Sequence, residues 1–517
     1  MKYIYIIDLK DNTIEKQDYS FEKENYYGRS LAVSLIEKHV GKDTKRFQKD
    51  NAIVMAPGLF SGTQVPSTGR LVLATKAEGD KGVQIGNVSG SIAQKLASLN
   101  VAAIVIKGQC EEGSRKIIAI DDNGISVVER NDLKYKKSEE TIDTLRNNYD
   151  RDSAIIGIGP MGEKLVALST LFSTYPEGQP KYYCSRGAFG DVFGQKGLKA
   201  IVVTTDKYFQ SKCYDKEALS LESKKLSKLI VENDICGGAL PGYGSITLMK
   251  MLKQGKNIDI PMVQIKKNTM ILKDKVNKTC SPLCVIGCLN RHCTKDEDMF
   301  SSPAESEAYA ALEQCFNIQD VKFAREINRE LFELGVDSIE FLFGCNLYSK
   351  ANDIKVTKDI LMNMVRDLEN LTLVGRTIGS KTKGIYNLYK ENNNLKDLVS
   401  KPSISQEKNF NINLKYKPKD FHNVSDLELL YGEIMMLENL GFCLFSSFAL
   451  IDNEEALNII SNLFYYRTGI KIDPKKLIED GLKSIDEEIE FERQAKNYSV
   501  EKTIPEFVKV LYRYFQS

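Results

Sequence analysis

The hydrophobic pattern of this 517-residue chain changes character near residue 210. Before that point, short apolar runs such as 102–108 and 154–159 predict β-strands, and glycine-dense segments separate them. After it, segments with helical apolar spacing predominate, among them 320–335 and 425–441. The sequence therefore predicts an α+β protein, in which a glycine-rich N-terminal β domain is followed by two mostly helical domains.

The length of the chain exceeds what one hydrophobic core usually serves, so several domains are expected. We predict a β domain at 1–207, a helical domain with a cysteine-rich loop at 208–400, and a second helical domain at 401–517. The last boundary falls in a polar stretch, 390–420, that is rich in asparagine and lysine.

The charge and hydropathy of the chain exclude several classes of partner. Its 71 Lys and Arg residues nearly cancel its 70 Asp and Glu residues, so no global field attracts nucleic acid or anionic membranes. No run of eighteen uncharged apolar residues predicts a membrane span, and the N-terminus lacks the pattern of an export signal. We therefore expect a cytoplasmic protein whose thiols are reduced.

Four cysteines lie in the segment NKTCSPLCVIGCLNRHC, residues 277–293. In a reducing compartment such a cluster favours metal binding over disulfide bridges. The four-residue spacing of Cys280, Cys284 and Cys288 allows their thiolates to reach one small inorganic core. Zinc accepts the same ligands, and an unligated structural knot is a third reading. The spacing favours an iron–sulfur cluster and leaves these alternatives open.

A second cysteine stands in a distinctive local pattern near the C-terminus. A predicted helix ends at Gly441, and Cys443 follows after one apolar residue. The same device occurs earlier, where Gly335 ends a helix and Asp337 follows. These two elements resemble the paired DxxGLC and DxxGLD motifs of the aldehyde ferredoxin oxidoreductase family.

Glycine-rich segments of the N-terminal half resemble further motifs of this family, in the same order along the chain. They are YYGRSLAVSLI, NAIVMAPGLFSGTQVPSTGRLVLATKA, GNVSGSIAQKLASLNVAAIVIKGQ, IGIGPMGEKLVALSTL and SRGAFGDVFGQKGLKAIVV. Each glycine pattern alone is weak, but five in order together with both cysteine elements identify the chain as a divergent member. The family's N-terminal β domain is the base for its cofactor, and two helical domains cover it.

The resemblance implies a tungsten or molybdenum bis-pterin cofactor beside a 4Fe–4S cluster. The cluster ligands fall on Cys284, Cys288 and Cys443, with Cys280 as the expected fourth ligand and Cys293 as its rival. The residues expected to bind the pterin are Arg70, Asn87, Gly90, Arg186, Gly187, Gly190, Asp337 and Glu438. Arginine suits a phosphate, glycine lets backbone amides approach it, and asparagine suits the edge of a heterocycle.

The chain departs from the family pattern at some of these positions. A family arginine is replaced by Tyr182, and the leading aspartates of the two helix–glycine motifs are Phe332 and Glu438. Phenylalanine cannot accept a hydrogen bond, and tyrosine lacks the charge that suits a phosphate. These changes raise the alternatives that this member holds its cofactor differently, or has lost one pterin or the metal.

The segment SPAESEAYAAL resembles a family segment near the metal and places Glu305 and Glu307 as candidate proton acceptors. His422 is a weaker candidate for a histidine found near the metal in some relatives. Together these features predict an oxidoreductase that oxidises an aldehyde or related carbonyl to the acid and passes electrons to ferredoxin or a similar carrier. A homodimer is one possible oligomeric state. The alternative is an iron–sulfur electron-transfer or scaffold protein of the same fold without an active metal–pterin centre.

Overall fold

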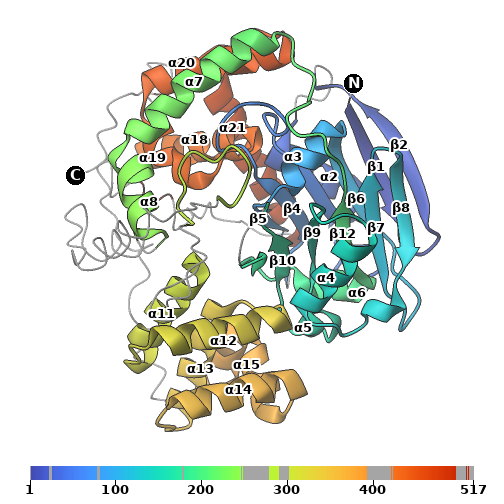
Figure 1. The fold of residues 1–517 in the computed structure, drawn as a ribbon, viewed down its shortest axis with the longest axis vertical. Coiled ribbons are helices and arrows are strands. Elements are labelled where there is room, and N and C mark those ends of the chain that lie inside the picture. The colour runs from blue at the N-terminus through green and yellow to red at the C-terminus, as the bar shows by residue number, and fades with distance from the viewer. Residues whose placement is uncertain are drawn as a thin grey trace.

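Two six-stranded sheets form the N-terminal part of the molecule (Figure 1). The computed structural model describes residues 2–21, 26–78, 82–176, 180–245, 247, 279–289, 302–392, 421, 423–496, 508 and 511. The first sheet has the strand order β2-β1-β6-β3-β4-β5, and the second has the order β11-β10-β9-β12-β7-β8.

The strands of the first sheet are β1 (Lys2–Asp8), β2 (Thr13–Tyr19), β3 (Ile53–Pro57), β4 (Leu71–Lys76), β5 (Val83–Val88) and β6 (Val101–Lys107). Those of the second are β7 (Lys116–Asp121), β8 (Gly124–Glu129), β9 (Ala154–Ile158), β10 (Leu171–Thr174), β11 (Tyr182–Cys184) and β12 (Leu198–Val203).

The two sheets have the same topology. Adding six to each strand number of the first sheet gives the order of the second, read from its other end. In each sheet one pair is parallel, β1 with β6 and β7 with β12, and the other neighbours are antiparallel. Their registers also correspond, because Pro57 at the end of β3 faces Leu71 and Ile158 at the end of β9 faces Leu171. The N-terminal part is therefore a structural duplication.

Apolar side chains from both sheets form one shared core, which includes Ile104 and Ile156. Helices α3 (Ile92–Ser98) and α6 (Gly190–Lys196) contribute to this core. The other face of the first sheet packs on α2 (Gly28–His39), and that of the second sheet on α4 (Ser138–Asn148). Strands β6 and β9 are buried on both faces and consist of continuous apolar runs. The strands predicted at 102–108 and 154–159 are therefore confirmed.

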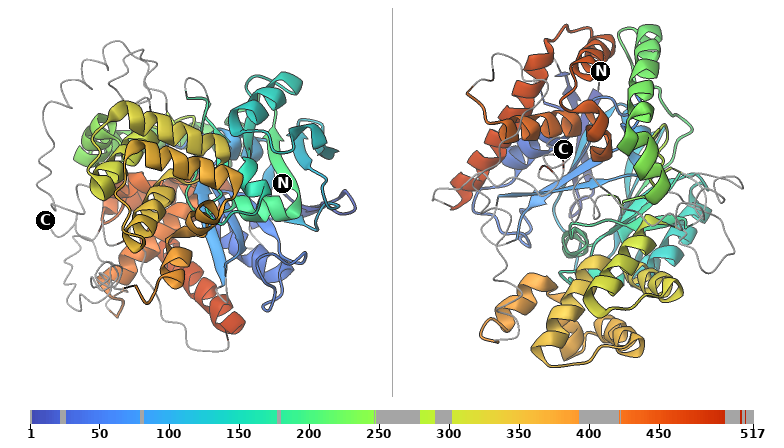
Figure 2. Two further views of the ribbon diagram at one scale, coloured as in Figure 1. Left: turned by 90° about the horizontal axis from the view of Figure 1, so that it is seen from below. Right: turned by 90° about the vertical axis from the view of Figure 1, so that its left-hand side faces the viewer.

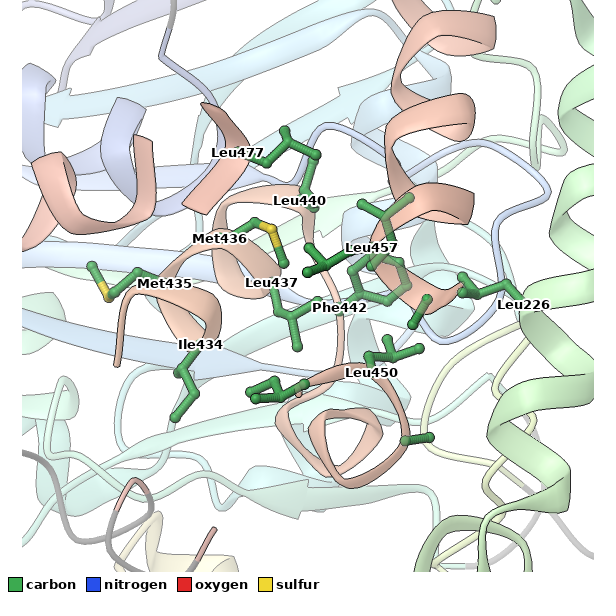
Figure 3. Packing of buried hydrophobic residues seen from close by; sticks show 14 of the residues in the cluster. Leu226, Ile434, Met435, Met436, Leu437, Leu440, Phe442, Leu450, Leu457 and Leu477 are labelled. Carbon is green, nitrogen blue, oxygen red and sulfur yellow. The ribbon is translucent and has the colours of Figure 1, made fainter. Parts of the chain in front are cut away.

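Two groups of helices lie at opposite ends of the sheet region (Figures 1 and 2). One group shares a hydrophobic core that includes Leu226, Leu437 and Leu457 (Figure 3). Its larger helices are α7 (Lys216–Glu232), α18 (Asp426–Leu440), α20 (Glu454–Thr468) and α21 (Pro474–Lys496), and its short segments are η2 (Asp234–Ala239), α8 (Leu240–Tyr243), η5 (Leu444–Ser446) and α19 (Ser447–Leu450).

The other group has a separate core around Leu331 and Leu361. Its helices are α11 (Pro303–Phe316), α12 (Val321–Leu334), α13 (Ser338–Ala351), α14 (Lys358–Asn370), α15 (Leu373–Gly379) and α16 (Lys381–Leu388). The predicted α+β architecture, with a β region followed by mostly helical regions, is confirmed. The exact domain limits at 207 and 400 stay predictions. Within the described residues, none of the helices combines the length and the apolar character that crossing a bilayer requires.

Candidate cofactor site

The C-terminal end of α18 packs directly against the loop that follows β3. Helix α18 begins at Ser425, whose hydroxyl accepts a hydrogen bond from the Glu428 amide, and it ends at Gly441 with a φ of 94°. A Cβ atom on Gly441 would lie 2.9 Å from the Cα atom of Gly58. Both the left-handed conformation and this close approach require glycine. We call this contact the first cap.

Backbone hydrogen bonds join the first cap to the cysteine-rich loop, residues 279–289, which we call the thiol loop. The Arg70 amide donates to the carbonyl of Gly441 (3.3 Å), and the Cys443 amide donates to the carbonyl of Ser67 (2.8 Å). The Ser67 amide in turn donates to the carbonyl of Leu283 (2.9 Å). Ser67 therefore ties Cys443 to a loop that is distant in sequence.

The four cysteines that the sequence singled out meet at this junction. Cys280, Cys288 and Cys443 are buried, and Cys284 is partly exposed. The Cys284 thiol has a raised pKa, first because of its hydrogen bond with Cys280, then because of burial and the neighbouring thiols, Cys443 included. Burial and the charges of Cys280 and Cys443 also raise the pKa of Cys288. The structure thus brings Cys443 to the thiol loop.

The Arg70 guanidinium lies within this group of thiols. Its Nη2 donates a hydrogen bond to Cys443 Sγ at 3.0 Å. Among the described residues, no group of three or more Cys, His, Asp or Glu side chains has the arrangement that holds one metal ion. A cubane cluster differs from such a site, because each of its four thiolates binds a different iron atom. The arrangement is a candidate cluster site, and the ligand roles stay predictions.

Polar side chains beside the first cap form a connected network. Glu438, three residues before Gly441, is buried and accepts hydrogen bonds from Arg29 Nη1 (2.5 Å) and Asn87 Nδ2 (2.7 Å). Arg29 also forms an ion pair with Glu488 at 2.7 Å. The other amide atom of Asn87, Oδ1, is buried and has no hydrogen-bond partner among the residues that the structure describes. An unpaired buried acceptor is costly, and a ligand N–H would satisfy it.

The end of α12 repeats the first cap on the second sheet. Helix α12 ends at Gly335 with a φ of 73°, and a Cβ atom there would lie 2.6 Å from the nitrogen of Gly159, which follows β9. The Thr170 amide donates to the carbonyl of Gly335 (2.8 Å), and the Asp337 amide donates to that of Leu168 (3.3 Å). We call this contact the second cap. In it, Asp337 corresponds to Cys443 and Thr170 to Arg70.

The side chains around the second cap are mainly apolar. Phe332, three residues before Gly335, occupies the position of Glu438 and is buried. Cys184, which corresponds to Asn87 by strand register, lies with its Sγ 3.5 Å from the Phe332 carbonyl oxygen. The Tyr182 ring lies 6.4 Å from that of Phe332, and its hydroxyl donates to Glu333 at 2.5 Å. The polar network of the first cap has no counterpart here among the described residues.

Comparison with known proteins agrees with this geometry. Residues 4–205 match the family described as aldehyde ferredoxin oxidoreductase, N-terminal domain. The two-sheet region of the chain is therefore similar to the N-terminal domain of this family. Over 342 residues it is 28% identical to the tungsten-containing aldehyde ferredoxin oxidoreductase of Pyrococcus furiosus, covering 64% of this chain and 54% of that protein. The corresponding protein of Thermococcus kodakarensis is 25% identical, with 64% and 55% covered. The matched region thus spans about half the length of these relatives.

A solved structure shares the fold of the whole chain. It is the active site complex BamBC of benzoyl coenzyme A reductase in complex with 1,5-dienoyl-CoA. The TM-score is 0.73 at 16% sequence identity, and the superposition covers 99% of this chain and 93% of the other. The likeness shows that the two chains share one fold, in their helical regions as well as in their sheets.

Glycines predicted to bind the pterin differ in their surroundings. A Cβ atom on Gly90 would lie 2.8 Å from the Thr174 carbonyl oxygen, and one on Gly190 would lie 2.8 Å from the Ser169 carbonyl carbon. Packing alone therefore requires glycine at both positions. Gly187, with a φ of 103°, has open space beside it. It lines a cavity of about 450 Å³ with Asp337, Glu340 and Lys381, among other residues.

The two candidate proton acceptors lie in ion pairs. Glu305 is buried and pairs with Arg329 (3.0 Å) and Arg325 (3.6 Å). Glu307 pairs at 2.5 Å with Arg186, whose side chain is 61% exposed. Asp337 begins α13, accepting from the amides of residues 339 and 340, and its burial raises its pKa although Arg186 opposes the shift. The catalytic and pterin-binding roles of these residues stay predictions.

Cys293 and His422 lie outside the described residues. Sequence analysis missed Arg29, which joins Glu438 to Glu488, and Ser67, which joins Cys443 to the thiol loop. Arg29 stands within the segment YYGRSLAVSLI, which was used only as a family marker. The contribution of Ser67 is mainly through its backbone, so no side-chain pattern could have indicated it.

Proposed function

We propose that this chain is an oxidoreductase that uses a tungsten or molybdenum pterin centre and a 4Fe–4S cluster. The observation that carries the proposal is the junction at Ser67, which brings Cys443 to the thiol loop beside Arg70. Cys280, Cys284, Cys288 and Cys443 would hold the cluster. Four thiolates are the usual ligand set of a cubane.

The residues around the first cap fit a pterin cofactor. In the described part of the chain Asn87 Oδ1 is an unpaired acceptor, Glu438 is a buried carboxylate held by Arg29, and Arg70 is a cation at the edge of the thiol group. Arg70 would bind a phosphate and, through its bond to Cys443, position a cluster ligand. The bound cofactor would supply two-electron exchange with a carbonyl substrate.

The residues around the second cap do not fit a pterin in the same way. Phe332 has no acceptor for an amino group, and the Tyr182 hydroxyl is already bonded to Glu333. Here the chain departs from the symmetrical pair of pterin sites that the family resemblance implied. We therefore propose that cofactor binding depends on the first cap and that no second pterin occupies the position of Phe332.

The proposed substrate is an aldehyde or related carbonyl, and the proposed acceptor is ferredoxin or a similar carrier in the cytoplasm. The names of the curated relatives and the family support this assignment at the level of an oxidoreductase. Glu307, held by Arg186, is the better placed proton acceptor, because Glu305 is held by two arginines in the interior. The second candidate is an iron–sulfur electron carrier of this fold without the metal–pterin centre, which the apolar second cap favours.

Anaerobic purification followed by analysis of iron, sulfide, tungsten, molybdenum and released pterin tests the proposal. We expect about four irons per chain, together with tungsten or molybdenum and pterin. Iron and sulfide without the heavier metal or pterin would establish the second candidate. A protein reconstituted anaerobically that binds neither iron nor sulfide would refute both.

A further inference from the structure

A second cavity, of about 470 Å³, lies where the edge of the first sheet meets the end of α20. Its walls include Lys2 of β1, the loop residue Leu59, and Arg467 in the last turn of α20. The rings of Phe21 and Tyr27, whose centroids are 5.2 Å apart, form its apolar side. The lining also includes Gly58, which belongs to the first cap.

Arg467 is unusual among the buried arginines of the described chain. Arg46 pairs with Asp191 at 2.6 Å, and Arg115 pairs with Glu163 at 2.8 Å. Arg467 is 9% exposed, yet in the described residues its side chain has only the Leu59 carbonyl as a hydrogen-bond partner, accepting from Nε at 3.2 Å. Its two terminal nitrogens are left for the cavity.

Lys2 adds a second cation without a carboxylate partner in the described part of the chain. Burial lowers the pKa of Lys2, and the nearby charge of Arg467 lowers it further. Burial likewise lowers the pKa of Arg467. Lys212 adds an exposed positive charge to the lining of the cavity. Among the described lining residues, the one carboxylate is that of Asp18, which is exposed. A buried cation, Arg467, beside a partly buried one, Lys2, is costly unless an anion compensates their charges.

We propose that this cavity binds a small organic anion with an aromatic or similarly flat apolar part. Its carboxylate or phosphate would lie between Arg467 and Lys2, and its apolar part against Phe21 and Tyr27. A guanidinium with two free terminal nitrogens suits bidentate contact with either group. The cavity volume lies within the range of about 300–1,000 Å³ typical of small-molecule sites.

Leu59, in the wall of the cavity, links this site to the first cap. The amide of Leu59 donates to the carbonyl of Asn439 (3.3 Å), and the amide of Phe60 donates to that of Leu440 (3.0 Å). Arg467 holds the carbonyl of the same Leu59. An anion bound at Arg467 would therefore stabilise the docking of α18 and α20 on the first sheet, and would raise the melting temperature of the protein.

The test compares phenylacetate and phenyl phosphate with neutral phenylacetamide, by calorimetric titration and thermal melting of the full-length protein. We expect at least one of the two anions to bind and to raise the melting temperature, and the amide to bind at least about tenfold more weakly. The preferred anion identifies the head group. Binding that weakens with added salt is also expected.

Variants connect the binding to the named residues. Arg467→Gln and Lys2→Gln should each weaken anion binding by about tenfold, the loss expected for one charged contact. Arg493→Gln is the matched control, because that arginine is exposed on α21 and pairs with Glu490. If Arg467→Gln fails to fold, Lys2→Gln, at the start of β1, still tests the proposal. Equal binding of acid and amide, or unchanged binding in both cavity variants, would overturn the proposal. Neither readout depends on the metal content of the protein.

Discussion

The two caps have one backbone plan and two different sets of side chains. In each, a helix ends at a glycine with positive φ that packs on a glycine after the central strand of a sheet. The same pair of amide–carbonyl bonds ties each cap to the loop before the next strand. Around the first cap lie Arg70, Asn87 and Glu438, whereas Thr170, Cys184 and Phe332 occupy the corresponding positions around the second.

The difference between the caps distinguishes residues needed for the fold from residues proposed to bind the cofactor. The glycines and the clasping hydrogen bonds are kept at both caps because they dock the helical regions on the sheets. Within the described residues, the network of Arg29, Asn87 and Glu438 lies only at the first cap, where the four thiols also meet. A residue shared by both caps therefore indicates docking, and a residue peculiar to the first cap indicates the cofactor.

The largest expected difference concerns Cys443 and its counterpart Asp337. Cys443→Ser should reduce the visible absorbance of the iron–sulfur centre by about tenfold or more, because one of four thiolates is removed. Asp337→Asn keeps an acceptor for the start of α13 and should leave this absorbance intact. Spectra and iron content of anaerobically purified variants measure both. Equal absorbance in the two variants would remove Cys443 from the ligand set.

Replacing either cap glycine should destabilise the fold by a similar amount. Gly441→Ala and Gly335→Ala each place a Cβ atom within 3 Å of backbone atoms and impose a left-handed conformation on alanine. We expect a loss of about 2–4 kcal/mol in the free energy of unfolding for each. Gly124→Ala is the control, since its φ is 142° but nothing lies within 4 Å of the new atom. Denaturant titration should show a smaller loss there.

The side chains three residues before the cap glycines should differ in their effect on the cofactor. Glu438→Gln removes the ion pair with Arg29, but Arg29 keeps its ion pair with Glu488. We therefore expect the free energy of unfolding to fall by about 1–2 kcal/mol and less pterin to be bound. Phe332→Leu should cost about 1 kcal/mol through lost ring contacts and leave pterin content unchanged. The amount of pterin released per chain, measured by fluorescence, distinguishes the two expected outcomes. A fall in both variants would place a pterin at the second cap as well.

A pH dependence of stability is expected from Glu433 of α18, at a position that is apolar in α12. Burial raises the pKa of Glu433 in α18 to about 8, so the folded state retains a proton there that the unfolded state has lost. Stability should therefore fall as the pH rises from about 5 to about 8, by up to about 4 kcal/mol. Glu433→Gln should reduce this slope by the contribution of Glu433, leaving that of other raised carboxyls such as Glu37. The corresponding residue of α12 is Ile327, and Ile327→Val should leave the slope unchanged.

Much of the fold could be predicted from local patterns. Apolar runs indicated buried strands such as β6 and β9, and the glycines at 335 and 441 correctly ended α12 and α18. The duplication of the sheets was not predicted, because strand order depends on pairings between distant segments. Equivalent positions such as Asn87 and Cys184 are also chemically too different to show a repeat in one sequence.

The candidate site was predictable in part. The spacing of the cysteines and the helix–glycine device pointed to Cys280, Cys284, Cys288 and Cys443, which the structure brings together. The contacts that hold Arg70 and Glu438 in place could not be predicted, since they join side chains hundreds of residues apart. The environment of Arg467 was equally hidden, because its local sequence does not indicate that it has no carboxylate partner within the described residues.

The position of Ser67 also has a consequence for how the protein is made. Its backbone fastens Cys443 on one side and the thiol loop on the other, so both must arrive before the thiol group is complete. During synthesis the three cysteines of the thiol loop, Cys280, Cys284 and Cys288, leave the ribosome long before Cys443. If the proposed cluster is bound, iron delivered too early would meet an incomplete set of thiols, and we expect loading only after the last helices have docked.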